Sequence, residues 1–160
     1  MEEDKLTDKF EIFNKMSDKI NSTYMYSPAQ LAYAGDAVFE LLVRSYVLNN
    51  YDISVNRMHR LTVKFVKAKA QAYIVSQLVN ELSEEEKKLV KRGRNAKVTS
   101  SPKNVEFMDY RYATGFEALL GYLFLNKEID RLMYIFDKTI DIIVEKDDKI
   151  ENNRGKESGN

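Results

Sequence analysis

Apolar side chains recur every three or four residues along most of the chain, which is the spacing of amphipathic helices. Alternation of apolar and polar residues, the pattern of a half-buried strand, is almost absent. The sequence therefore predicts an all-α fold with about six or seven helices. With 160 residues the chain has the length of one domain.

Three segments differ in composition. We expect an amphipathic helix and connector over residues 1–26, the main helical domain over 27–145 and a disordered polar tail over 146–160. The sequence shows neither a signal-peptide pattern nor an apolar run long enough to span a bilayer. A cytoplasmic protein without a membrane partner is the expectation.

The segment from residue 27 to 49 predicts a helix that is apolar on nearly every side and therefore packs inside the protein. Ser27 suits the N-cap, and the next residue, a proline, suits the first helical position. The charged residues of this segment are Asp36, Glu40 and Arg44, and their spacing of four places them on one stripe. A buried carboxylate needs a partner, so this stripe should face an opposite charge, a metal or water.

A second mostly apolar helix is predicted over residues 110–125, with Glu117 as its isolated acid. Each acid has a glycine nearby, because Gly35 precedes Asp36 and Gly121 follows Glu117 by one turn. Glycine inside a helix costs about 1 kcal/mol relative to alanine, which suggests close approach of another backbone or a ligand. The pattern is that of a helix pair that holds a cation between its two acids.

The chemistry of such a site is restricted by composition. The chain has no cysteine and a single histidine, so a metal would need oxygen ligands, which favours Mg²⁺ or Mn²⁺. An alternative remains open, in which Asp36 and Glu117 form ion pairs with Arg44 and Arg111.

Positive charge is concentrated in the middle of the chain. Between Val55 and Val105 there are 12 Lys and Arg against four acids, although the whole chain has 25 of each sign. One long helix is expected over residues 55–80, with Met58, Leu61, Phe65, Ala68, Ala72, Val75 and Val79 on its apolar face and a basic opposite face. Ser83 to Glu86 then fits a capping box for a short helix that Gly93 closes, followed by a mobile basic loop.

A polyanion such as nucleic acid would suit this middle third. The residues we expect to contact phosphates are Arg57, Arg60, Lys64, Lys91, Arg92, Arg94, Lys97 and Lys103. The alternative is a solvated basic face that only balances the acidic ends of the chain.

Three motifs in this order, LAYAGDAVFE, KRGRNAK and FEALLGYLFL, resemble the catalytic domain of the ribonuclease III family. The similarity covers roughly residues 27–140 and is closest to the Mini-ribonuclease III branch, which lacks a double-stranded-RNA-binding domain. It implies a homodimeric helical bundle of the ribonuclease III endonuclease type.

The resemblance also implies which residues act. Asp36 and Glu117 match the family's catalytic metal ligands, with Mg²⁺ as cofactor and Mn²⁺ as a substitute. Two further acids of the usual pattern are replaced by Ala32 and Thr114, so we expect waters at the vacated coordination positions. Possible outer-sphere helpers are Glu40 and Asp109.

The implied activity is hydrolysis of double-stranded RNA to 5′-phosphate ends, with precursor 23S ribosomal RNA as the implied substrate. A two-fold dimer would place one site at each strand, and we expect its contact around Gly35 and Val38. Two alternatives stay open. One is a duplex-RNA-binding or ribosome-associated module with this fold that does not cleave, and the other is a purely structural helical interaction protein.

Overall fold

The computed structural model describes residues 26–97, 103 and 105–157. The amphipathic helix expected near the N-terminus lies outside these residues, as does most of the basic loop after residue 97. The described chain contains helices and no strand, which confirms the all-α prediction. In order, the helices are α2 (Pro28–Asn50), α3 (Val55–Val66), α4 (Ala68–Leu78), α5 (Glu84–Arg94), α6 (Phe107–Leu125) and α7 (Ile129–Glu157).

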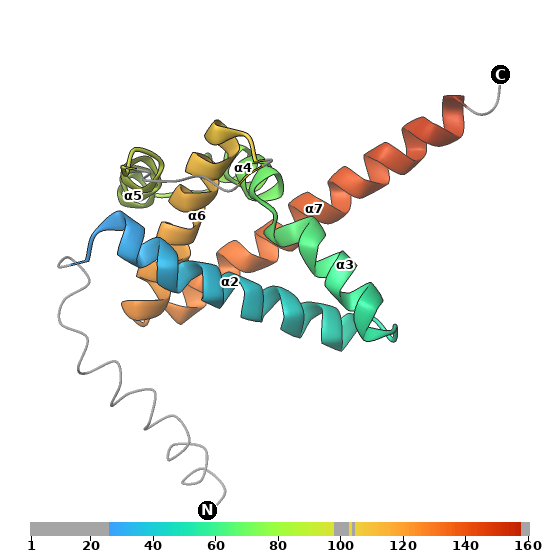
Figure 1. Ribbon diagram of the computed structural model, residues 1–160, viewed down its shortest axis with the longest axis horizontal. Helices are drawn as coiled ribbons and strands as arrows, with labels where there is room; N and C mark the ends of the chain where they lie inside the picture. Colours follow the sequence, from blue (N-terminus) through green and yellow to red (C-terminus); the bar gives the residue numbers. More distant parts are fainter. Residues whose placement is uncertain (1–25, 98–102, 104, 158–160) are drawn as a thin grey trace, which may run out of the picture.

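Helix α6 is the centre of the molecule. It crosses α2 and also packs on α4 and α5, while α7 contacts α4 and α6 (Figure 1). Its buried residues are Ala113, Gly115, Phe116, Ala118, Leu119, Leu120, Gly121 and Leu123. Burial on so many sides explains why the sequence of α6 shows so little amphipathic pattern.

Glycines allow the close packing around α6. A Cβ atom at Gly35 would lie 1.7 Å from the carbonyl oxygen of Glu117, and one at Gly121 would lie 2.0 Å from the carbonyl oxygen of Leu31. The predicted close approach at these two glycines is confirmed, and the partner is the other helix's backbone. Gly35 is buried within the protomer and Val38 is partly buried, so the dimer contact expected around these two residues stays a prediction.

A second pair of glycines joins α5 to α6. A Cβ at Gly93 would lie 2.7 Å from the Cα of Gly115. The prediction that Gly93 closes its helix is wrong, because α5 continues to Arg94 and its C-cap is Asn95. The predicted caps are confirmed, because both Ser27 and Ser83 accept from the N3 backbone in complete capping boxes.

The single helix expected over residues 55–80 is broken at Lys67. This residue has an extended backbone, with φ −62° and ψ 145°, and separates α3 from α4. The break changes which side of α4 faces the core. The buried residues of α4 are Ala70, Gln71, Ile74, Val75 and Leu78, whereas Val79, expected on the apolar face, is exposed.

Helix α2 is buried on one side only. Leu31, Ala32, Phe39, Val43 and Val47 enter the core, together with Gly35. The opposite side carries three exposed apolar residues, Tyr33 (86% exposed), Leu41 (66%) and Leu48 (67%). The expectation that this helix is enclosed on all sides is therefore only half met.

The sequence predicts a disordered tail from residue 146. Instead helix α7 continues to Glu157, and its last turns extend away from the other helices (Figure 1). None of the described helices combines the length and the hydropathy needed to cross a bilayer.

Candidate metal centre

The crossing of α2 and α6 brings Asp36 and Glu117 into electrostatic contact. Asp36 follows Gly35, whose backbone lies against the Glu117 carbonyl, so the two acids sit at the same point of the crossing. The negative charge of Asp36 contributes to raising the pKa of Glu117. The structure thus places the two acids singled out from the sequence at one helix crossing.

The two carboxyl groups have different environments. Burial raises the pKa of Glu117 to about 7, and the charge of Asp36 adds to this effect against a hydrogen bond from Gln71. Asp36 is more exposed, and its pKa is raised mainly by partial burial and then by the charge of Glu40. In both residues burial is the main cause of the raised pKa, and it favours the neutral carboxyl group.

In the described part of the chain, Arg44 and Arg111 do not form ion pairs with Asp36 or Glu117. Arg44 donates from Nε to Glu40 at 2.9 Å, and Arg111 donates from Nε to the carbonyl oxygen of Arg94 at 2.6 Å. Within the described residues neither Asp36 nor Glu117 forms an ion pair. The alternative in which these acids are ion-paired with Arg44 and Arg111 is therefore not what the structure shows.

Gln71 is not among the site residues predicted from the sequence. Its side-chain Nε2 donates to Glu117 Oε1 at 2.9 Å and to the Val66 carbonyl oxygen at 2.9 Å. The available signal was its spacing of three, four and seven residues from the apolar Ile74, Val75 and Leu78. The prediction of one unbroken helix placed Gln71 off the apolar face and hid that signal.

The two positions that lack the family's acids are also defined. Ala32 is buried in the core, and Thr114 donates its hydroxyl to the Tyr110 carbonyl at 2.9 Å. Thr114, Glu117 and Gln71 line one cavity of about 210 Å³. No cluster of three or more acidic, His or Cys side chains suited to a metal occurs in the described chain.

The donor set nevertheless fits a hard divalent cation. The charge of Asp36 helps to raise the pKa of Glu117, and the Oε1 atom of the neighbouring Gln71 is buried without a hydrogen-bond partner in the described protein. Oxygen ligands are those that Mg²⁺ prefers, and Mg²⁺ usually keeps several waters and needs only one or two carboxylates. Asp36 and Glu117 are the residues that would hold it.

The two expected outer-sphere acids lie in different places. Glu40 is one turn from Asp36 and affects its pKa, although its carboxylate is bonded to Arg44. Asp109 lines a larger cavity of about 690 Å³ together with Lys91 and Arg94. Only Glu40 is therefore placed beside the acid pair.

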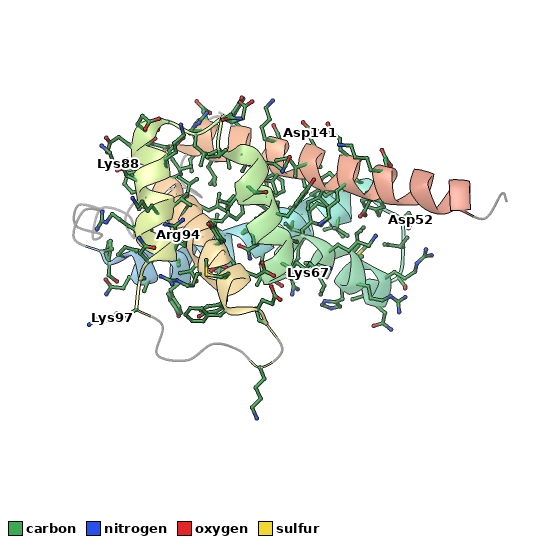
Figure 2. All side chains as sticks on the ribbon, turned by 90° about the horizontal axis from the view of Figure 1, so that it is seen from above. Asp52, Lys67, Lys88, Arg94, Lys97 and Asp141 are labelled. Atoms are coloured by element: carbon green, nitrogen blue, oxygen red, sulfur yellow. The ribbon has the colours of Figure 1, made fainter. Side chains whose placement is uncertain are left out.

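The expected phosphate-contacting residues are mostly at the surface. Those with exposed side chains are Arg57, Arg60, Lys64, Lys91, Arg92, Lys97 and Lys103. Arg94 is partly buried and bonds to the Tyr112 hydroxyl at 3.3 Å, and Lys64 forms an exposed ion pair with Asp147 at 3.1 Å. Figure 2 shows Lys67, at the α3–α4 break, and Lys97, beyond α5, toward the same side of the molecule.

Comparison with known proteins identifies relatives over most of the chain. The Ribonuclease III domain model matches residues 29–128. The Mini-ribonuclease 3 of Thermoanaerobacter sp. (strain X514) is 51% identical over 119 residues, which is 74% of this chain and 84% of the relative. The Mini-ribonuclease 3 of Clostridium tetani (strain Massachusetts / E88) is 44% identical over 133 residues, 82% of this chain and 88% of the relative.

A solved structure is also similar. The crystal structure of a Fusobacterium nucleatum protein aligns with a TM-score of 0.66 at 32% identity, and the alignment covers 73% of this chain and 93% of that one. The chain is therefore similar to known proteins both in sequence and in fold.

Proposed function

The chain belongs to the ribonuclease III family, and from this membership we propose that it is a metal-dependent endonuclease that cleaves double-stranded RNA. The observation that carries the proposal is the pairing of Asp36 with Glu117 at the glycine-mediated crossing of α2 and α6. Burial disfavours the ionised form of Glu117, and a bound cation would favour that form.

We propose Mg²⁺ as the cofactor, with Mn²⁺ as a substitute, held by Asp36 and Glu117. When bound, such an ion supplies a water of lowered pKa and neutralises charge that develops on the phosphate. Glu117 must lose its proton to act as a ligand, and Gln71 favours this by donating a hydrogen bond to the carboxylate. The reaction would break a phosphodiester bond and leave a 5′-phosphate and a 3′-hydroxyl.

We assign duplex binding to the exposed arginines of α3 and α5, which we call the basic surface. Arg57 and Arg60 on α3 and Arg92 on α5 have exposed side chains that can reach backbone phosphates. Double-stranded RNA is recognised mainly by shape, phosphates and 2′-hydroxyls, which such residues can contact without reading sequence. The affinity should therefore depend strongly on salt.

We further propose that the protein acts as a homodimer through the exposed side of α2. Tyr33, Leu41 and Leu48 recur along this side and are exposed in the protomer. Burial of such a stripe against its two-fold copy would remove apolar area from water. A dimer of this kind would direct one acid pair to each strand of a duplex.

The resemblance to the Mini-ribonuclease III branch implies a biological substrate. We propose double-stranded stems of precursor 23S ribosomal RNA, cleaved in the cytoplasm. The relatives named Mini-ribonuclease 3 support the assignment to this branch.

The test is incubation of end-labelled RNA and DNA duplexes of equal sequence with the purified protein in Mg²⁺, Mn²⁺ or EDTA. We expect cuts in both RNA strands with either metal, none in EDTA and none in DNA. Binding of the RNA duplex without cleavage under both metals would instead support the module that binds and does not cut.

A further inference from the structure

Gln71 is a polar residue at a core position of α4. Its side chain is 2% exposed, and its neighbours along the buried face are Ala70, Ile74 and Val75. A buried amide is costly unless its donors and acceptor are used, so an apolar residue would be the simpler choice here. The hydrogen-bond partners of Gln71 explain why this position carries an amide.

One contact is with the break between α3 and α4. In a continuous helix the Val66 carbonyl would accept from the backbone N–H of Ala70. That N–H bonds instead to the Lys67 carbonyl at 2.9 Å, and Gln71 Nε2 donates to the Val66 carbonyl at 2.9 Å. The Gln71 side chain therefore provides a donor to the end of α3 at the point where the chain turns.

The other contact is with the acid pair. The second N–H of the same amide donates to Glu117 Oε1 at 2.9 Å. The amide orientation is determined by its surroundings, because both the Val66 carbonyl and the Glu117 carboxylate accept hydrogen bonds. The amide oxygen, Oε1, then faces away from both and is buried without a partner in the described protein.

We propose that Gln71 is a positioning residue for the metal centre, which fixes the carboxylate of Glu117 for metal binding. The inference rests on the proposed function of Glu117 as a ligand. Holding one oxygen of the carboxylate leaves the other available for the ion.

The same side chain links the metal centre to the basic helix α3. Because Gln71 bonds both to the last carbonyl of α3 and to Glu117, it holds the end of that helix in register with the catalytic carboxylate. Arg60 and Lys64 lie on α3. One amide thus bonds both to the end of the phosphate-contacting helix and to the metal ligand.

The test measures Mn²⁺ binding to the protein without RNA, by electron paramagnetic resonance of free Mn²⁺. The variants are Gln71→Met, which keeps the length and removes the donor, and Gln71→Leu. Loss of a group that orients a metal ligand typically weakens metal affinity by about 10- to 100-fold, and we expect this for both variants. Gln77→Leu is the matched control, because Gln77 is an exposed glutamine of the same helix and should leave Mn²⁺ affinity unchanged.

A purely structural role for Gln71 predicts a different result. Packing is largely kept in Gln71→Met, so a structural role would lower the thermal unfolding temperature without moving Mn²⁺ affinity, and that result would overturn the inference.

Failure of the inference can be distinguished from failure of the proposed function through Glu117→Gln. If wild type binds Mn²⁺ and Glu117→Gln does not, while Gln71→Met and Gln71→Leu bind normally, only the role of Gln71 is refuted. If wild type itself binds no Mn²⁺ and cleaves no RNA, the metal centre is refuted and the role of Gln71 with it.

Discussion

The carbonyl oxygen of Glu117 occupies the space that a side chain at Gly35 would need. A Cβ atom at Gly35 would lie 1.7 Å from this oxygen and 2.8 Å from the backbone nitrogen of Gly121. The absence of a side chain lets α2 and α6 touch through their backbones, and Asp36, the next residue, then lies beside Glu117. The missing side chain at Gly35 thus allows the helix crossing that places the two acids together.

Replacement of Gly35 should therefore damage the whole protein. We expect Gly35→Ala to lower the free energy of unfolding by more than about 3 kcal/mol, because the obstructing atoms are backbone atoms that cannot rotate away. Urea denaturation followed by circular dichroism measures this. Gln77→Ala, at an exposed position of α4, is the control and should change stability by less than about 0.5 kcal/mol. Wild-type stability of Gly35→Ala would show that the two helices can separate at no cost.

Local signals were sufficient to predict much of this arrangement from the sequence. Ser27 and Ser83 carry capping boxes within four residues, and the isolated acids with nearby glycines identified both helices of the crossing. These features depend on residues near each other in the chain, which is why the pattern revealed them.

What the sequence could not reveal depends on tertiary packing. Lys67 is neither glycine nor proline and nothing beside it marks a helix end, yet packing holds it in an extended conformation. The break changed the buried face of α4, so Gln71 was missed. Gly93 was read as a helix terminator, whereas it serves a second close contact with Gly115. A glycine has the same sequence signal in either role.

Stability without metal should depend on the ionisation of Glu117. Its pKa is raised from 4.5 to about 7 in the folded protein, so the folded state retains a proton that the unfolded state loses. The stabilising contribution is complete below about pH 4.5 and is lost as pH rises through about 7. One pKa unit corresponds to about 1.4 kcal/mol, so the loss should reach about 3 kcal/mol.

The measurement is urea denaturation of wild type and Glu117→Gln in EDTA at pH 5 and pH 8. Glu117→Gln keeps a group of the same shape without the charge, so its stability relative to wild type should increase between these pH values. An equal pH dependence in the two proteins would mean that Glu117 is not held in a raised-pKa environment.

The basic surface should determine the salt dependence of RNA binding. Removal of three phosphate contacts in Arg57→Ala, Arg60→Ala and Arg92→Ala combined should reduce the slope of log affinity against log salt by about 3. Fluorescence anisotropy with a labelled RNA duplex in EDTA measures the slope. The control is Lys88→Ala, because Lys88 is exposed on α5 but paired with Glu85. An unchanged slope in the triple variant would remove these arginines from the interface.

The exposed side of α2 should control assembly. Leu41→Lys combined with Leu48→Lys places charges of the same sign in the proposed contact. Burial of these charges should disfavour dimer formation by more than any single apolar contact there favours it. We expect wild type to sediment as a dimer and this variant as a monomer at micromolar concentration. Val79→Lys, a similar change at an exposed valine of α4's end, should leave the dimer intact. A monomeric wild type would refute the proposed dimer.

The most direct test of the central claim is single-turnover cleavage of an RNA duplex by Asp36→Asn and by Glu117→Gln in saturating Mg²⁺. Removal of either ligand should cost more than the roughly 100-fold typical for a residue that only supports a ligand. Duplex affinity measured in EDTA should remain close to that of wild type in both variants. If either variant cleaves within tenfold of wild type, the two acids do not act together as the metal site, and the account of this crossing is wrong.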